Sequence, residues 1–79
     1  MMDIISEFTN KLNTNGKVMF KLYSLDYIIE KVDDKFTIYP EIYPPKSKQK
    51  FNSLQELLDN YYIYNESISS NLERVSNIN

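Results

Sequence analysis

The chain has 79 residues, a length that makes one small domain, and it contains no histidine, no cysteine, no tryptophan and a single glycine. The missing histidine and cysteine exclude thiol nucleophiles, structural zinc sites, haem ligation and iron–sulfur clusters, and one glycine is too few for a dinucleotide-binding or phosphate-binding loop. The net charge of −2 and the pI of about 5.0 argue mildly against nucleic acid or an anionic membrane as a partner. We therefore expect a protein that is not an enzyme, uses no cofactor or metal, and works by binding.

The first predicted element is a helix over about residues 3–13. Its apolar residues recur at helical spacing and would face a core: Ile4, Ile5, Phe8 and Leu12. Asp3 can cap the start, and Gly16 stands just past the end, where glycine commonly terminates a helix. From Lys17 the apolar period changes to two, which predicts a strand with one buried side. That side is formed by Val18, Phe20 and Leu22.

Two further strands complete a predicted antiparallel meander. Residues 27–32 are rich in β-formers and apolar on both faces, so we expect them to form the central strand. Asp33 and Asp34 make a tight turn, because aspartate tolerates the left-handed conformation better than most residues. The third strand covers about residues 35–43. Within it Pro40 cannot donate a ladder hydrogen bond, which predicts a sheet edge or a bulge at that point.

A loop and a second helix follow the meander. Residues 44–50 begin with two prolines, contain three lysines, and form the clearest loop in the chain. Ser53 and Glu56 have the spacing of a capping box, in which the serine oxygen accepts from the backbone at the glutamate and the carboxylate bonds back. The helix that starts there has a buried stripe of Leu54, Leu57, Leu58 and Tyr61.

The last residues permit a short final helix. From residue 65 onward, apolar residues recur at spacings of four and then three: Ile68, Leu72 and Val75. We expect the tail to be frayed from about residue 76. The predicted fold is α+β, with an N-terminal helix, a three-stranded antiparallel meander, a C-terminal helix and this short last helix in one domain of residues 1–79.

Residues 51–61 resemble the start of the second helix in the Src-homology phosphotyrosine-binding domain: an aromatic residue, then Ser-Leu, a pair of apolar residues and a tyrosine. Residues 27–29 and 36–38 are similar to two strands that precede that helix in the family. The resemblance covers residues 27–61, which correspond to the C-terminal half of such a domain, and it implies phosphotyrosine binding. That family holds the phosphate with an arginine in an early strand, and here Lys21 is the nearest residue to that position.

Tyrosines and charged residues share the outward side of the predicted strands. They are Lys21, Tyr23, Tyr39, Glu41 and Tyr43. Tyrosine offers broad contact area with a polar tip and loses little entropy on binding, so this surface predicts an interaction with another protein. A second interpretation stays open: if the two terminal helices cover one face of the sheet each, the same tyrosines belong to the core. The oligomeric state is not determined by these patterns.

A lysine-rich loop is the second candidate site. Lys46, Lys48 and Lys50 lead directly into the helix start at Ser53. Positive side chains beside free backbone N–H groups favour an anion, so these four residues could bind a phosphate group or a nucleic acid. The simpler interpretation is that the lysines are solvated and that the capping box already uses part of the donor set. Nucleic acid is therefore the less favoured partner.

The chain carries acidic residues near its start, where a secretory signal carries basic ones, and no apolar stretch approaches the roughly 20 residues that span a bilayer. We expect a cytoplasmic protein without membrane contact. The weighting toward Asn, Ile, Lys and Tyr, with no alanine, is the bias of an AT-rich genome and indicates a low-GC bacterium or its phage. Size and bias together suggest a third function, an inhibitor from a phage or mobile element that docks on a host protein.

Overall fold

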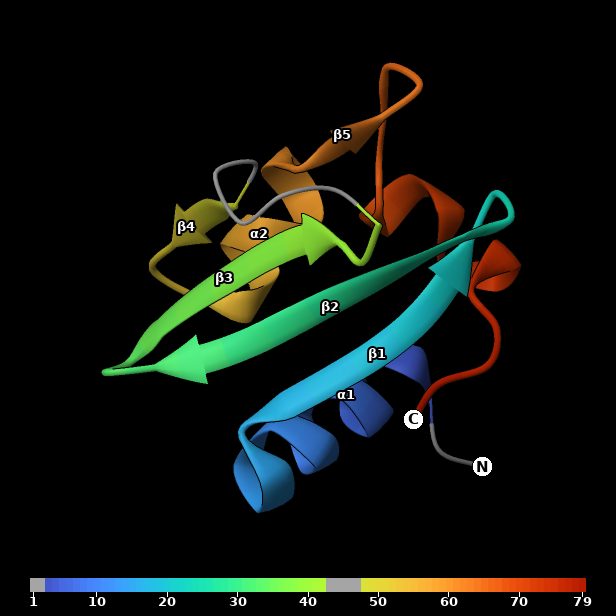
Figure 1. Ribbon diagram of the computed structural model, residues 1–79. Helices are drawn as coiled ribbons and strands as arrows, with labels where there is room; N and C mark the ends of the chain where they lie inside the picture. Colours follow the sequence, from blue (N-terminus) through green and yellow to red (C-terminus); the bar gives the residue numbers. More distant parts are fainter. Residues whose placement is uncertain (1–2, 43–47) are drawn as a thin grey trace.

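The computed structural model describes residues 3–42 and 48–79, and it has the α+β fold that the sequence predicts (Figure 1). The elements in chain order are α1 (Ile4–Asn15), β1 (Lys17–Leu22), β2 (Leu25–Val32), β3 (Lys35–Pro40), β4 (Gln49–Phe51), α2 (Leu54–Asn60), β5 (Tyr62–Ile63), β6 (Glu66–Ser67) and the 3-10 helix η2 (Ser69–Arg74). The first four strands form one antiparallel sheet in the order β1-β2-β3-β4, and β5 pairs with β6 as a separate hairpin. None of the helices among the described residues has the length and apolar character needed to cross a bilayer.

Both ends of α1 are held by the residues that the sequence predicts. The Oδ1 atom of Asp3 accepts a hydrogen bond from the backbone N–H of Ser6 at 2.7 Å, and hydrogen bonds from Ser6 lower the pKa of the Asp3 carboxyl. Gly16 adopts a left-handed conformation with φ of 73°, and its N–H donates to the carbonyl of Leu12 at 2.9 Å. The helix therefore continues to Asn15, slightly beyond the predicted end, and stops at the only glycine.

The sheet has one strand more than the sequence predicts, because Gln49–Phe51, expected partly as loop, forms β4 beside β3. Phe51 stands opposite Phe36, and both rings pack against the core, which anchors this short strand. The third strand ends at Pro40, earlier than predicted. β4 pairs with β3 only as far as Ile38, so within the described residues Pro40 has no strand beside it on that side, in agreement with its missing N–H.

Three two-residue hairpin turns have the same backbone form, with positive φ at both positions. They are Tyr23-Ser24 (φ 54° and 68°), Asp33-Asp34 (51° and 64°) and Tyr64-Asn65 (54° and 67°). Positive φ at both central residues defines the turn that matches the right-handed twist of antiparallel strands. The turn at Asp33-Asp34 is confirmed as predicted, whereas tyrosine at the first position of the other two turns is an uncommon choice for this conformation.

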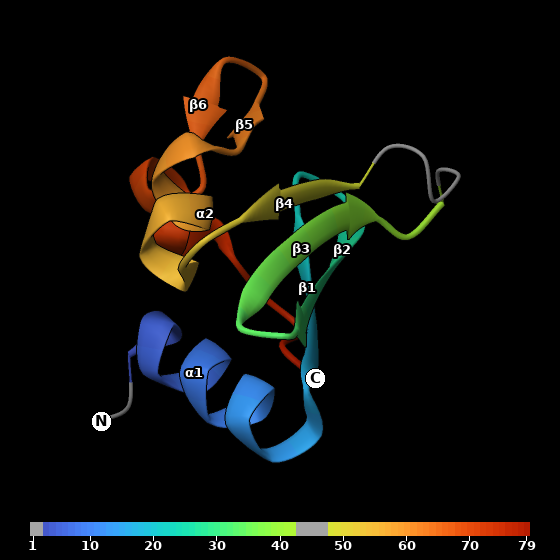
Figure 2. The same ribbon diagram turned by 90° about the vertical axis from the view of Figure 1, so that its left-hand side faces the viewer.

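The described helices lie on one side of the four-stranded sheet (Figure 2). That side carries the alternate residues Val18, Phe20, Leu22, Tyr27, Ile29 and Ile38, all of them buried. α1 adds Phe8 and Leu12 to this core, and α2 adds Leu57 and Leu58. The arrangement with one helix on each face is therefore wrong, because both helices bury their apolar stripes against the same face of the sheet.

The C-terminal part differs from the predicted helix. The run after Tyr61 forms the β5–β6 hairpin, and η2 replaces the expected last helix with a 3-10 turn. In place of a frayed end, residues 76–79 run beside β1 and exchange four backbone hydrogen bonds with Met19 and Lys21, three of them between 2.8 and 3.0 Å. This segment therefore covers the edge of β1, which would otherwise present unpaired N–H and C=O groups.

Candidate functional site

The side of the sheet away from the helices, named here the open face, is not covered by any described element (Figure 2). Strand register assigns to it Lys17, Met19, Lys21, Asp26, Ile28, Glu30, Val32, Lys35, Thr37, Tyr39 and Lys50. With Lys48 at the start of β4, the open face holds five lysines against two carboxylates. A chain with a net negative charge therefore has one basic surface.

The middle of the open face is a small apolar and aromatic cluster. Ile28 on β2 stands between Met19 on β1 and Tyr39 on β3, and only 7% of Ile28 is exposed. The Nζ atom of Lys48 lies 4.7 Å from the centre of the Tyr39 ring and 3.5 Å from Oε1 of Glu30. A partly exposed ion pair of this kind contributes little stability by itself, and the same ammonium group makes a cation–π contact with the Tyr39 ring.

The environment of Tyr39 raises the pKa of its hydroxyl. Burial is the main cause, and the negative charge of Glu30 and a hydrogen bond to its carboxylate raise the pKa further. Like any tyrosine hydroxyl, it is protonated at neutral pH and can donate a hydrogen bond. A half-buried ring with a polar tip, surrounded by lysines, is suited to contact another molecule across the open face.

Only two residues of the predicted tyrosine surface share the open face, namely Lys21 and Tyr39. Tyr23 lies in the turn after β1, where positive φ breaks the alternation of the strand, and its hydroxyl lies 2.8 Å from Oδ1 of Asn71. Glu41 is exposed beyond the end of β3. Tyr43 lies outside the described residues. The prediction that Tyr23 continues the strand face is wrong, because β1 ends at Leu22 and Tyr23 lies in the turn. The backbone N–H of Glu41 still donates to the carbonyl of Asp26 at 2.9 Å, just past the end of β3.

The predicted anion site does not come together at the start of α2. Lys46 lies outside the described residues, Lys48 contacts Glu30 and Tyr39, and Lys50 belongs to the open face on β4. The Oγ atom of Ser53 accepts from the backbone N–H of Glu56 at 3.0 Å, which confirms this half of the capping box. Lys48 and Lys50 thus extend the basic open face.

Sequence reasoning missed a second surface, named here the tyrosine end, formed by Tyr23, Tyr64 and Arg74. The rings of Tyr23 and Tyr64 meet edge to face with their centres 5.3 Å apart and an interplanar angle of 76°. The guanidinium carbon of Arg74 lies 6.0 Å from the centre of the Tyr23 ring. Tyr64 is 72% exposed. The signal available in the sequence was the Tyr-Asn pair between two short β-prone pairs, which marks a tight hairpin turn.

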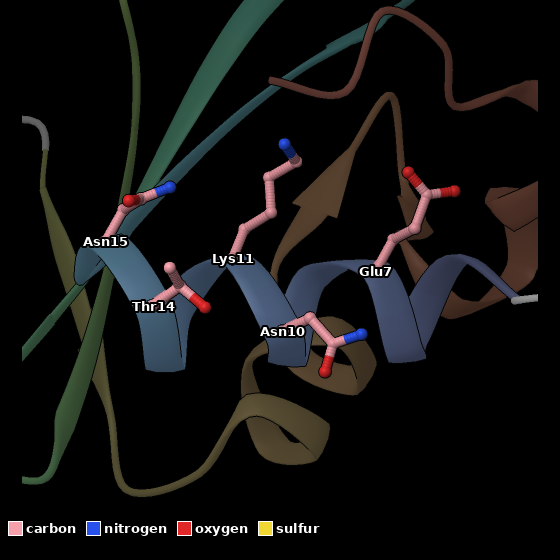
Figure 3. Close-up of a pocket in the computed structure, with 5 residues that line it drawn as sticks. All are labelled: Glu7, Asn10, Lys11, Thr14 and Asn15. Atoms are coloured by element: carbon pink, nitrogen blue, oxygen red, sulfur yellow. The ribbon is translucent and has the colours of Figure 1, made fainter.

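A shallow hollow follows the outer side of α1 (Figure 3). It is lined by Glu7, Asn10, Lys11, Thr14 and Asn15. In Figure 3, Glu7 and Lys11 extend to one side of the helix, whereas Asn10 and Thr14 point another way, so these side chains do not converge on one point. Across residues 3–42 and 48–79, no group of three or more aspartates or glutamates is placed to hold a metal ion. The hollow therefore provides no catalytic constellation that we can define.

This chain matches no protein-family model, no curated protein and no solved structure. The resemblance of residues 27–61 to the Src-homology phosphotyrosine-binding domain is not tested by these comparisons and stays a prediction. Lys21, the residue nearest to that family's phosphate-binding arginine, stands opposite Asp26 on the open face.

Proposed function

We propose that this protein is a non-catalytic binding module and that its open face binds an acidic surface of another protein. The observation that carries the proposal is the one-sided packing: the described helices bury one face of the sheet and leave the other face uncovered. An antiparallel sheet commonly packs one face on the core and leaves the other facing water, so this face is available to a partner.

The composition of the open face supports a protein partner. Its centre is apolar and aromatic, formed by Met19, Ile28 and Tyr39, and its periphery carries lysines. Protein interfaces share this arrangement, with well-packed aromatic anchors at the centre and a polar rim around them. The five lysines favour a partner with complementary negative charge, because opposite charges speed up association and exclude partners of the same sign.

The proposal is tested by changing the central ring. Tyr39→Ser, alone or combined with Tyr43→Ser, is expected to weaken binding of the captured partner by about tenfold, since it removes the anchor and the cation–π contact with Lys48. The partner is first isolated with the immobilised chain from the source cell and identified by mass spectrometry, and its affinity for each variant is then measured by calorimetry. Tyr39→Phe is the matched control and should retain most of the affinity. Unchanged binding by Tyr39→Ser, or loss of the fold, would contradict the proposal.

A second candidate function uses the same lysines. Lys17, Lys21, Lys35, Lys48 and Lys50 form a basic surface that a nucleic acid or another phosphate-bearing molecule could also bind. Ionic strength separates the two functions by the steepness of its effect. Every lysine–phosphate contact releases counterions, so a nucleic-acid complex weakens steeply and log-linearly with salt, whereas a protein complex anchored on the apolar centre, with the lysines only around it, weakens less. Binding of a fluorescent single-stranded oligonucleotide at 50 mM and at 200 mM salt distinguishes them.

A further inference from the structure

We infer that the tyrosine end is a second interaction surface, separate from the open face, and that it binds a lysine- or arginine-bearing segment of another protein. The inference rests on three residues, Tyr23, Tyr64 and Arg74, together with Glu66 beside Tyr23. It goes beyond the proposed function, because the tyrosine end is formed by two hairpin turns and η2 and not by the open face.

Two hairpin turns that are far apart in the sequence meet at this end. The turn at Tyr23-Ser24 joins β1 to β2, and the turn at Tyr64-Asn65 joins β5 to β6, which projects from the body of the molecule (Figures 1 and 2). Each turn places a tyrosine at a positive φ, where asparagine, aspartate or glycine is the common choice. Backbone conformations of this kind, unfavourable for the residue that adopts them, are found more often where function requires that side chain.

The two rings are held in a defined arrangement before any partner arrives. The hydroxyl of Tyr23 lies 2.8 Å from Oδ1 of Asn71 and 3.1 Å from Oε2 of Glu66, so two acceptors share its proton. Asn71 is buried, and its Nδ2 donates to the carbonyl of Ser67 at 3.0 Å, which ties η2 to the hairpin. Tyr64 then packs edge to face on the anchored Tyr23 ring. A surface held in this way loses little conformational entropy when it binds.

The chemistry of the surface favours a cation. Glu66 stands at its edge, where its Oε2 atom lies 3.1 Å from the Tyr23 hydroxyl. Arg74 already occupies a position over the Tyr23 ring, which demonstrates that an aromatic face here accepts a guanidinium group. Tyr64 is largely exposed. A basic side chain of a partner can therefore stack on the exposed Tyr64 ring next to the Tyr23–Glu66 pair, whereas an acidic side chain gains no such contact with the ring face.

The inference is tested with the whole chain labelled with nitrogen-15 and two synthetic peptides of equal length. One peptide carries two arginines, and in the other these are replaced by glutamates. We expect the arginine peptide to shift the amide resonances of residues 62–67 and of the Tyr23 turn, and the glutamate peptide to shift none of them. Tyr64→Leu keeps apolar area but loses the ring, so it should weaken binding of the arginine peptide by about tenfold, while Tyr64→Phe should retain it.

Several results would overturn the inference. Equal shifts with both peptides would show that charge does not select the ligand, and Tyr64→Leu binding as well as wild type would remove the role of the ring. Amide shifts confined to open-face residues would show that the arginine peptide binds there and not at the tyrosine end. A dilution series without peptide is recorded first: if residues 62–67 shift with protein concentration and the peptide adds nothing, the occupant is a second copy of this chain and the inference is wrong. Tyr39→Ser serves as the matched control and should leave peptide binding unchanged, so failure here is distinct from failure of the proposed function.

Discussion

At the scale of single residues, the positions with a left-handed backbone are of two kinds. One stabilises the fold, and the other places side chains of the candidate binding surface. Gly16 ends α1 with φ of 73°, as expected of a residue without a Cβ atom. Tyr23 and Tyr64 adopt φ of 54° although their side chains make this costly. The glycine serves the fold by stopping a helix, whereas the two tyrosines bring their rings together at the surface.

Substitution of Gly16 measures how much free energy a Cβ atom costs in the left-handed conformation. Gly16→Ala should lower the free energy of unfolding by about 1 kcal/mol, because a Cβ atom disfavours the left-handed conformation. No heavy atom lies within 4 Å of the position that the new Cβ would take, so no steric clash adds to this cost. Urea denaturation measures the change, and Gly16→Asn, which tolerates the conformation better, should lose less. Equal stability of Gly16→Ala and wild type would show that α1 ends differently in solution.

Burial of tyrosines also sets how stability depends on alkaline pH. Burial raises the pKa of Tyr23, Tyr39 and Tyr61, so the folded chain binds more protons than the unfolded chain above the ordinary tyrosine pKa of about 10. Their contribution is fully present below that value and is lost as pH rises through the folded pKa values. We expect the urea midpoint to fall between pH 10 and pH 12, and to fall less in Tyr39→Phe. A midpoint that rises over this interval would contradict the burial of these phenols.

At the scale of elements, the two edges of the sheet are protected from further strand pairing in different ways. On one side, residues 76–79 pair with β1 through Met19 and Lys21. On the other side, the three-residue strand β4 carries Lys50 and follows Lys48. Charged residues and short length discourage further strand pairing at β4, whereas β1 depends on the tail to satisfy its backbone groups.

Removing the tail tests this dependence. Deletion of residues 76–79 should lower the free energy of unfolding by roughly 1–3 kcal/mol, because it removes four backbone hydrogen bonds and the contact of Ile78 with the core. The exposed edge of β1 should also promote association that increases with concentration, measurable by analytical ultracentrifugation. Ser76→Ala is the control and should have little effect, since its backbone makes the pairing. Unchanged stability and a monomeric deletion variant would show that the tail does not protect this edge.

At the scale of the whole molecule, the adjacent β2 residues Ile28 and Ile29 lie on opposite faces of the sheet and so differ in their surroundings. Ile29 is fully buried in the core between the sheet and the helices, whereas Ile28 faces the open side and lies outside that core. The sequence around them is apolar on both sides, which predicts a central strand but does not distinguish a two-layer domain from a three-layer one.

A matched pair of substitutions tests the two-layer arrangement. Ile29→Ala should cost about 3–4 kcal/mol, because it opens a cavity in the only core that the described residues form. Ile28→Ala should cost about 1–2 kcal/mol, since the open face can relax around the lost atoms. Thermal and urea denaturation compare the two variants. Equal costs would indicate that a second layer covers the open face in solution.

Local interactions were the part of this protein that the sequence determined by itself. The cap at Asp3, the stop at Gly16, the turn at Asp33-Asp34 and the helix start at Ser53 all depend on contacts within a few residues, and the structure has each of them. Alternation of apolar residues also predicted the first and third strands, and a run of β-forming residues predicted the second. With the helical pattern of α1 these gave the α+β class, because such patterns are properties of consecutive positions.

Tertiary structure alone decided which surfaces remain available for binding. β4 is too short to show a pattern, and its pairing with β3 and the pairing of residues 76–79 with β1 come from segments distant in the chain. The same holds for the contact of Tyr23 with Tyr64 and for the packing of both helices on one face. These features depend on the positions of elements in space, which no local periodicity encodes, and they separate a basic open face from a tyrosine end with Glu66 beside it.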